Sequence, residues 1–125
     1  MKNKVAVIDD NESNLMLEKD LLEVSGFVVF TATNGADGID LIKRERPDII
    51  IMDVRLPDIL GTEAVRRLRQ DQETRDIPVV FVTASVLEED KKKITPIPNS
   101  LFMSKPINTR TFVEEIRQFI KCARN

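Results

Sequence analysis

The stretch PDIIIMDVRLPDILG, residues 47–61, contains the pattern that decides the fold. Residues 49–52 are apolar at every position, whereas a strand with one solvated face would alternate apolar and polar residues. A short continuous apolar run is typical of a strand buried on both faces of a parallel sheet. Because the run ends directly at Asp53, the stretch predicts a buried strand that brings a carboxylate to its carboxyl end.

Similar apolar runs of strand length occur on both sides of this stretch. They occupy residues 5–8 and 79–82, which are also continuous, residues 27–30 and, more weakly, residues 101–103. Stretches with the spacing of helices separate these runs. Five strands that alternate with about five helices predict an α/β fold, a five-stranded parallel sheet in a doubly wound, three-layer sandwich.

The helices are inferred from apolar residues three and four positions apart. Leu17, Leu21 and Val24 predict the first helix. The later stripes are Ile39 and Ile42, Val65 and Leu68, and, most clearly, Phe112, Ile116, Phe119 and Ile120. A short, highly charged fourth helix is expected within residues 86–94, because two prolines follow it and prevent a long continuation.

Composition and charge narrow the functional class. The 125 residues include 19 Lys and Arg against 21 Asp and Glu, with a net charge of −2 and no His. This balance argues against a surface for nucleic acid or anionic membranes, which would need clustered basic residues. The lone Cys122 excludes an internal disulfide, and the lack of His excludes ordinary zinc sites and His-based triads. No apolar run approaches the ~20 residues of a membrane span. Because 125 residues is the length of one domain, we expect a single cytoplasmic domain over residues 1–125.

Polar side chains follow four of the five predicted strands. Asp9 and Asp10 come after the first strand and Asp53 after the third. Thr83 follows the fourth strand, and Lys105 follows the fifth. Because the carboxyl ends of parallel strands lie at one edge of the sheet, where such folds bind ligands, we expect these side chains to lie together.

Three clustered carboxylates repel one another unless a cation lies among them. Oxygen ligands without His or Cys favour a hard ion such as Mg²⁺, which could also bind an incoming phosphoryl oxygen. One carboxylate could then accept the phosphoryl group as a nucleophile, with a hydrogen bond from Thr83 and a positive charge from Lys105. The spacing alone does not identify which aspartate is the nucleophile.

Four segments together make the chain resemble a known family. They read VAVIDDNESN (residues 5–14), PDIIIMDVRLPDILG (47–61), IPVVFVTAS (77–85) and LFMSKPI (101–107). With this spacing the chain resembles a CheY-like response-regulator receiver domain of two-component signalling over nearly its whole length. The resemblance implies a flavodoxin-like sheet in the strand order 2-1-3-4-5, in agreement with the pattern of apolar runs.

The resemblance implies a role for each acidic residue at the sheet edge. Asp53 matches the phosphoacceptor, and Asp9 and Asp10 match the acidic pair that holds Mg²⁺ with it. Arg55, two residues after Asp53, matches a ligand that uses its backbone carbonyl. The family consists of signalling phosphoacceptors rather than enzymes, since its members assist only their own phosphotransfer and dephosphorylation.

The resemblance also implies a switch and its partners. Thr83 matches the hydroxyl that turns toward the phosphoryl group, Lys105 the lysine that binds this group, and Phe102 the aromatic residue that fills the vacated space. The donor would be a sensor histidine kinase or a histidine phosphotransfer protein, which supplies the His that this chain lacks. Phosphorylation would change the affinity for a downstream protein, with an activation-dependent homodimer as one form of output and no direct contact with nucleic acid or membrane.

Two alternatives stay open from the sequence, and two enzyme classes fit poorly. The chain could be a phosphorylation-independent pseudo-receiver, or a receiver excised from a larger regulator or hybrid kinase. Residues 96–100, PIPNS, depart from the family pattern near the output face, which motivates the pseudo-receiver. A phosphohydrolase would have a second aspartate where Arg55 stands, and a flavin-phosphate loop would need Ser, Thr or Gly after the first strand.

Overall fold

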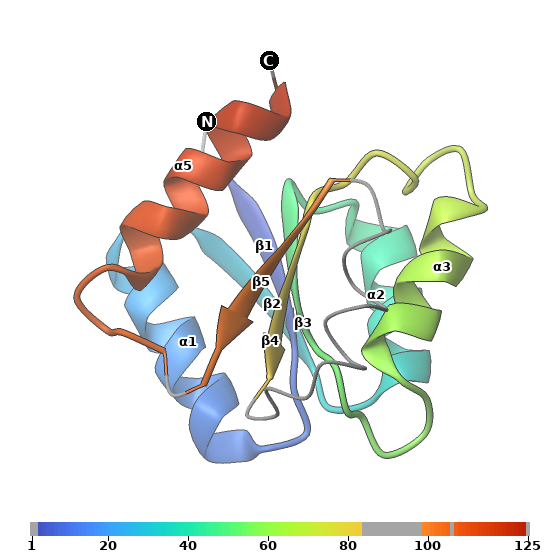
Figure 1. The fold of residues 1–125 in the computed structure, drawn as a ribbon, viewed down its shortest axis with the longest axis horizontal. Helices are drawn as coiled ribbons and strands as arrows, with labels where there is room; N and C mark the ends of the chain where they lie inside the picture. The colour runs from blue at the N-terminus through green and yellow to red at the C-terminus, as the bar shows by residue number, and fades with distance from the viewer. Residues whose placement is uncertain (1–2, 84–98, 106, 125) are drawn as a thin grey trace.

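The computed structural model describes residues 3–83, 99–105 and 107–124, and five parallel strands form one sheet between two layers of helices (Figure 1). The strands are β1 (Lys4–Ile8), β2 (Val28–Ala32), β3 (Ile49–Asp53), β4 (Val79–Thr83) and β5 (Ser100–Ser104). The helices are α1 (Glu12–Val24), α2 (Gly35–Glu45), α3 (Gly61–Arg69) and α5 (Phe112–Arg124). The spatial order β2-β1-β3-β4-β5 confirms the prediction, while the expected fourth helix, residues 86–94, lies outside the described residues.

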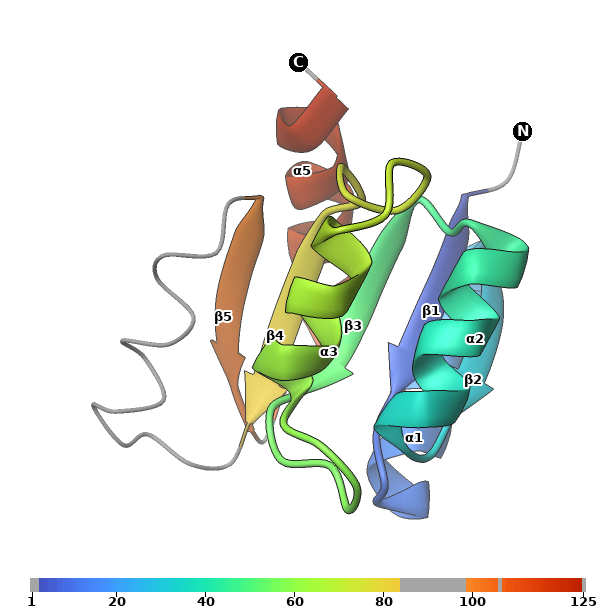
Figure 2. The same ribbon diagram turned by 90° about the vertical axis from the view of Figure 1, so that its right-hand side faces the viewer.

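Each face of the sheet is covered by its own pair of helices. Figures 1 and 2 show α2 and α3 on one face, with α1 and α5 on the other. Alternate residues of β3 pack against different pairs of helices, because successive side chains of a strand point to opposite faces. Ile50 and Met52 lie in the core cluster with α2 and α3, and Ile49 and Ile51 lie in the cluster with α1 and α5. All four are at most 1% exposed, which confirms a strand buried on both faces.

Helix α1 buries a different face from the one that its apolar residues predict. Leu17 is 41% exposed and Val24 is 89% exposed, so the predicted stripe is wrong at these two positions. The helix instead buries Glu18 and Leu22 and packs Leu15 partly against the core. These three residues have helical spacing, but the one in the middle is a carboxylate, so the positions of apolar residues alone do not mark this buried face.

Helix α5 covers the other half of the same face, as its stripe predicts. The stripe residues pack in one cluster, with Phe112, Ile116 and Ile120 buried and Phe119 partly buried. Arg117 joins α5 to the end of α1: its Nη2 donates to the carbonyl oxygen of Ser25 at 2.9 Å, and its guanidinium lies 5.7 Å from the ring centre of Phe27. Among the described residues, no helix has both the length and the apolar character needed to cross a bilayer.

Candidate functional site

The carboxyl ends of the strands bring the predicted polar residues to one edge of the sheet. Asp9 directly follows β1, Asp53 ends β3, Thr83 ends β4, and Lys105 directly follows β5. Asp53 is paired in register with Val82, so buried Thr83 lies one position beyond it on the neighbouring strand. The backbone N–H of Lys105 donates to the carbonyl oxygen of Thr83 at 2.9 Å. The parallel register therefore gathers residues from four separate parts of the chain.

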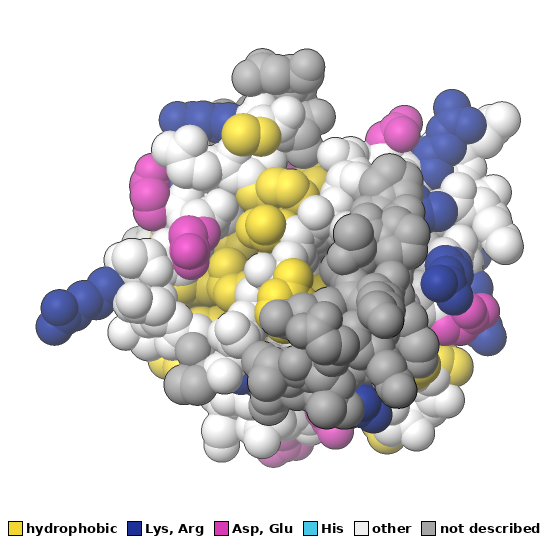
Figure 3. Space-filling model, in the orientation of Figure 1, with side chains coloured by type: hydrophobic (Ala, Val, Ile, Leu, Met, Phe, Trp, Pro, Cys, Tyr) yellow, Lys and Arg dark blue, Asp and Glu magenta, His cyan; other side chains and the backbone are white. Residues whose placement is uncertain are grey.

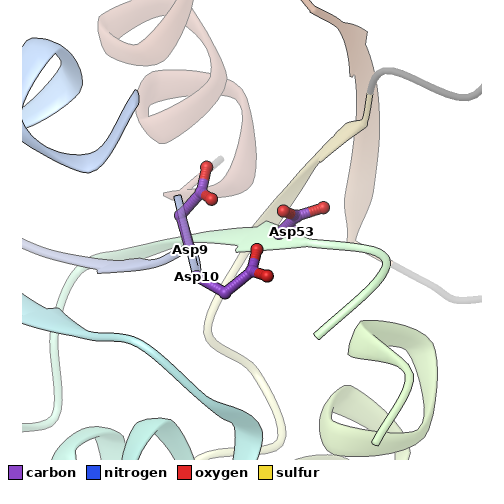
Figure 4. Close-up of side chains that lie close together, drawn as sticks. All are labelled: Asp9, Asp10 and Asp53. Atoms are coloured by element: carbon purple, nitrogen blue, oxygen red, sulfur yellow. The ribbon is translucent and has the colours of Figure 1, made fainter. Parts of the chain in front are cut away.

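Three carboxylates form a compact cluster at this edge. Asp9, Asp10 and Asp53 each offer an oxygen, and these oxygens lie within 4.8 Å of one another (Figure 4). Asp9 and Asp53 are 2% and 8% exposed, whereas Asp10 is exposed to solvent. Ligand sets made only of oxygen suit hard cations such as Mg²⁺, which keeps several of its waters when it binds. The donor set and its open side therefore fit the predicted ion.

One ammonium group partly offsets the charge of the cluster. Lys105 Nζ lies 2.8 Å from Asp9 Oδ2 and 3.2 Å from Asp53 Oδ2. Burial alone would lower the pKa of Lys105, but the hydrogen bond to Asp9 and the charge of Asp53 outweigh it and raise that pKa. Burial also raises the pKa of Asp53, against the opposing charge of Lys105. Three carboxylates and one ammonium leave the cluster negative, so a cation is favoured there.

Backbone donors orient the two buried carboxylates. Asp9 Oδ1 accepts from the N–H of Asn11 at 2.9 Å, and Asp53 Oδ1 accepts from the N–H of Arg55 at 3.2 Å. In each case the second oxygen, Oδ2, accepts from Lys105. Both side chains are thus held at both oxygens, and their orientation is fixed before any ligand binds.

A glycine allows the chain to turn back against the site after β3. A Cβ atom at Gly61 would collide with the backbone oxygen of Asp53 and would lie 2.9 Å from Met52 Cγ. The β3–α3 loop, residues 54–60, is closed by an antiparallel bridge between Arg55 and Leu60. The loop therefore begins and ends beside Asp53, with the side chain of Arg55 exposed.

Phe102 lies between the core and an apolar groove on the surface. It is half-buried in β5, in register with Phe81, and packs against the core cluster on the α2 and α3 face. It also lines a groove of about 690 Å³ between β5 and α5, together with Leu101, Met103 and Phe119. Figure 3 shows the hydrophobic side chains gathered in this hollow.

Glu18 is a residue near the site that the sequence did not reveal. It is 2% exposed, and its Oε1 has no hydrogen-bond partner among the described residues. Burial, and then the negative charge of Asp9, raise the pKa of Glu18 to about 7, against the charge of Lys105. The available signal was its position between Leu15 and Leu22 on the buried face of α1.

Several known proteins are similar to this chain over nearly its whole length. Residues 5–117 match the family model for the response regulator receiver domain. The polar-differentiation response regulator DivK of Brucella anthropi is 38% identical over 120 residues, which cover 96% of this chain and 98% of DivK. A CheY-like receiver domain protein from Methanospirillum hungatei has a TM-score of 0.92 at 22% identity, covering 99% of this chain and 98% of its own. The receiver domain of a sensor histidine kinase from Pseudomonas aeruginosa, with a magnesium ion coordinated in its active site cleft, has a TM-score of 0.87 at 24% identity over 97% and 99% of the two chains.

Proposed function

Because the chain belongs to the response regulator receiver domain family of two-component signalling, we propose that Asp53 is its phosphoacceptor. A carboxylate oxygen of Asp53 attacks the phosphorus of a phosphohistidine, the P–N bond breaks, and the imidazole nitrogen takes the electron pair. The product is an aspartyl phosphate. The 125 residues contain no His, so the donor histidine lies outside them, on a sensor histidine kinase or a histidine phosphotransfer protein in the cytoplasm.

The observation that carries this proposal is the shared hydrogen bonding of Lys105 within the acidic cluster. Its ammonium contacts Asp9 and Asp53 at once, and the raised pKa of Lys105 keeps it charged. A fixed positive charge beside the nucleophile is suited to binding the oxygens of a phosphoryl group. Attraction by Lys105 also opposes the rise in the pKa of Asp53 that burial causes, which favours the ionised, nucleophilic form.

We assign the Mg²⁺ site to the same cluster. Asp9, Asp10 and Asp53 would supply carboxylate oxygens, and Arg55 would supply its backbone carbonyl. When bound, Mg²⁺ neutralises charge on the transferring phosphoryl oxygens. The support for this assignment is the negative, oxygen-only set of donors, two of which are already oriented by backbone N–H groups.

We further propose that phosphorylation is transmitted through Thr83 and Phe102 to the groove between β5 and α5. The Thr83 hydroxyl would donate to the phosphoryl group, and Phe102 would move into the space that Thr83 leaves. Phe102 packs against the core, and its neighbours in β5, Leu101 and Met103, line the groove, so a movement of β5 at Phe102 would change the surface offered to a downstream protein. Light scattering of the phosphorylated and unphosphorylated protein tests whether a homodimer is one such output.

The phosphoacceptor is tested with acetyl phosphate and Mg²⁺, followed by measurement of the intact mass. We expect one phosphoryl adduct on the native protein, and none after chelation of Mg²⁺ or in Asp53→Asn. Asp20→Asn, which changes an exposed acid on α1, is the matched control and should be labelled like the native protein. An adduct that persists in Asp53→Asn would show that a different residue accepts the group.

A further inference from the structure

One carboxylate ties the β3–α3 loop to the start of α2. Asp58 Oδ1 accepts from the N–H of Gly35 at 2.7 Å, and its Oδ2 accepts from the N–H of Ala36 at 2.9 Å. Oδ1 also accepts from the N–H of Ile59 at 3.0 Å, within the loop itself. The backbone hydrogen bonds from Gly35 and Ala36 lower the pKa of Asp58, so the carboxylate is charged at neutral pH. Two backbone segments 23 residues apart are therefore joined by one side chain.

This link completes the cap of α2. The first four N–H groups of a helix have no partner within the helix. Asn34 is the N-cap of α2, and its side-chain oxygen accepts from the N–H of Asp37 at 2.8 Å. Its carbonyl accepts the first regular hydrogen bond of the helix, from the N–H of Gly38 at 3.0 Å. Asp58 accepts from the N–H groups of the first two residues of the helix, Gly35 and Ala36, and its negative charge suits the positive end of the helix. The distant loop thus supplies acceptors for two N–H groups that the side chain of Asn34 leaves open.

The contact is a close one, because Gly35 has no side chain. A Cβ atom at this position would collide with the side chain of Ile59 and would lie 3.2 Å from Asp58 Oδ1. The loop therefore rests directly on the first turn of α2.

The other side of the same loop faces the acidic cluster. Arg55 donates its N–H to Asp53, bridges to Leu60 across the loop, and is the residue whose carbonyl we assign to Mg²⁺. At the end of the loop, Gly61 donates its N–H to the carbonyl oxygen of Val54 at 2.7 Å. The loop is thus anchored at the site by these backbone contacts and at its far side by Asp58.

We propose that Asp58 is a positioning residue for the metal site: by holding the loop on the start of α2, its carboxylate fixes the backbone at Arg55. The inference rests on the proposed function, since it concerns the Mg²⁺ ligand assigned there. A carbonyl on an anchored loop binds the ion without first having to be ordered. Without the anchor, part of the binding free energy is spent on ordering residues 57–60, the mostly exposed part of the loop, and the affinity for Mg²⁺ falls.

The test is calorimetric titration of MgCl₂ into the native protein and Asp58→Ala, below the melting temperature of both. Residues that orient metal ligands typically affect affinity by 10–100-fold, so we expect Asp58→Ala to weaken Mg²⁺ binding about tenfold. Asp58→Asn keeps one oxygen acceptor and should lie between Asp58→Ala and the native protein. It also provides a folded variant if Asp58→Ala does not fold.

Two controls separate positioning from loss of helix stability and from loss of charge. Asn34→Ala removes the other side-chain cap of α2 but leaves the loop attached, so it should lower stability without weakening Mg²⁺ binding. Asp40→Asn removes a negative charge from an exposed position of α2 and should bind Mg²⁺ like the native protein. Equal weakening in either control would overturn the positioning role.

The remaining outcomes distinguish this inference from the proposed function. If the native protein binds Mg²⁺ and Asp58→Ala binds it equally well, the positioning role is wrong and the proposed function is unaffected. If the native protein binds no Mg²⁺, the proposed metal site is wrong, and the role of Asp58 is refuted with it.

Discussion

Replacing Glu18 by Gln should remove a pH dependence from the stability of the fold. The carboxyl is buried in α1, and its pKa is raised from 4.5 to about 7 in the folded protein. A folded-state pKa above the unfolded value means that the folded state binds the proton more tightly. The resulting stabilisation is fully present below pH 4.5 and is lost as the pH rises through 7.

The magnitude follows from the two pKa values. The difference between about 7 and 4.5, at about 1.4 kcal/mol for each pH unit, corresponds to about 3 kcal/mol in total. Most of this, about 2–3 kcal/mol, falls between pH 5 and pH 8. Gln has nearly the same size as Glu and does not ionise, so Glu18→Gln should lack this loss of stability.

The assay is urea unfolding followed by circular dichroism at pH 5 and pH 8, with a chelator present to remove divalent ions. The measured quantity is the change in unfolding free energy between the two pH values, compared between the native protein and Glu18→Gln. Glu23→Gln, at an exposed position of the same helix, is the matched control and should behave like the native protein. Equal pH dependence in the native protein and Glu18→Gln would refute the reasoning.

Three further substitutions test other parts of the structure. Gly61→Ala should lower the unfolding free energy by about 1–3 kcal/mol, because the added Cβ collides with the backbone of Asp53. An unchanged unfolding free energy in urea would contradict the close approach of Gly61 to Asp53. Lys105→Met should bind Mg²⁺ more tightly, by about 1 kcal/mol or about fivefold, because Lys105 Nζ competes with the ion for Asp9 and Asp53. Weaker binding of Mg²⁺ to this variant, measured by calorimetry, would contradict that competition. Arg117→Ala should cost about 1–2 kcal/mol through loss of the contacts to Ser25 and Phe27. For this variant, a midpoint in urea equal to that of the native protein would show that the contacts contribute nothing.

The sheet and the composition of the site could be predicted from sequence because both depend on local patterns. A continuous apolar run such as residues 49–52 predicts a strand with two buried faces, and the residue that follows it must lie at the sheet edge. Asp9, Asp53, Thr83 and Lys105 lie at that edge for this reason.

Other features depend on contacts that no local pattern contains. The buried face of α1 was missed because Glu18 interrupts its apolar stripe, and a buried carboxylate runs against the usual preference of charged residues for the surface. Asp58 gives no signal in the sequence, because the helix that it caps begins 23 residues earlier. Its contact depends on how α2 and the β3–α3 loop lie together after the sheet has formed.

The position of Lys105 in the chain has a consequence for synthesis of the protein. Its ammonium reaches Asp9 across 96 residues of sequence, from the position that directly follows β5. A ribosome therefore makes Asp9, Asp10 and Asp53 long before it makes the group that offsets their charge. Contacts of such long range cannot close until nearly the whole domain has emerged. A nascent chain that lacks β5 and Lys105 thus carries the three acids without their counter-charge.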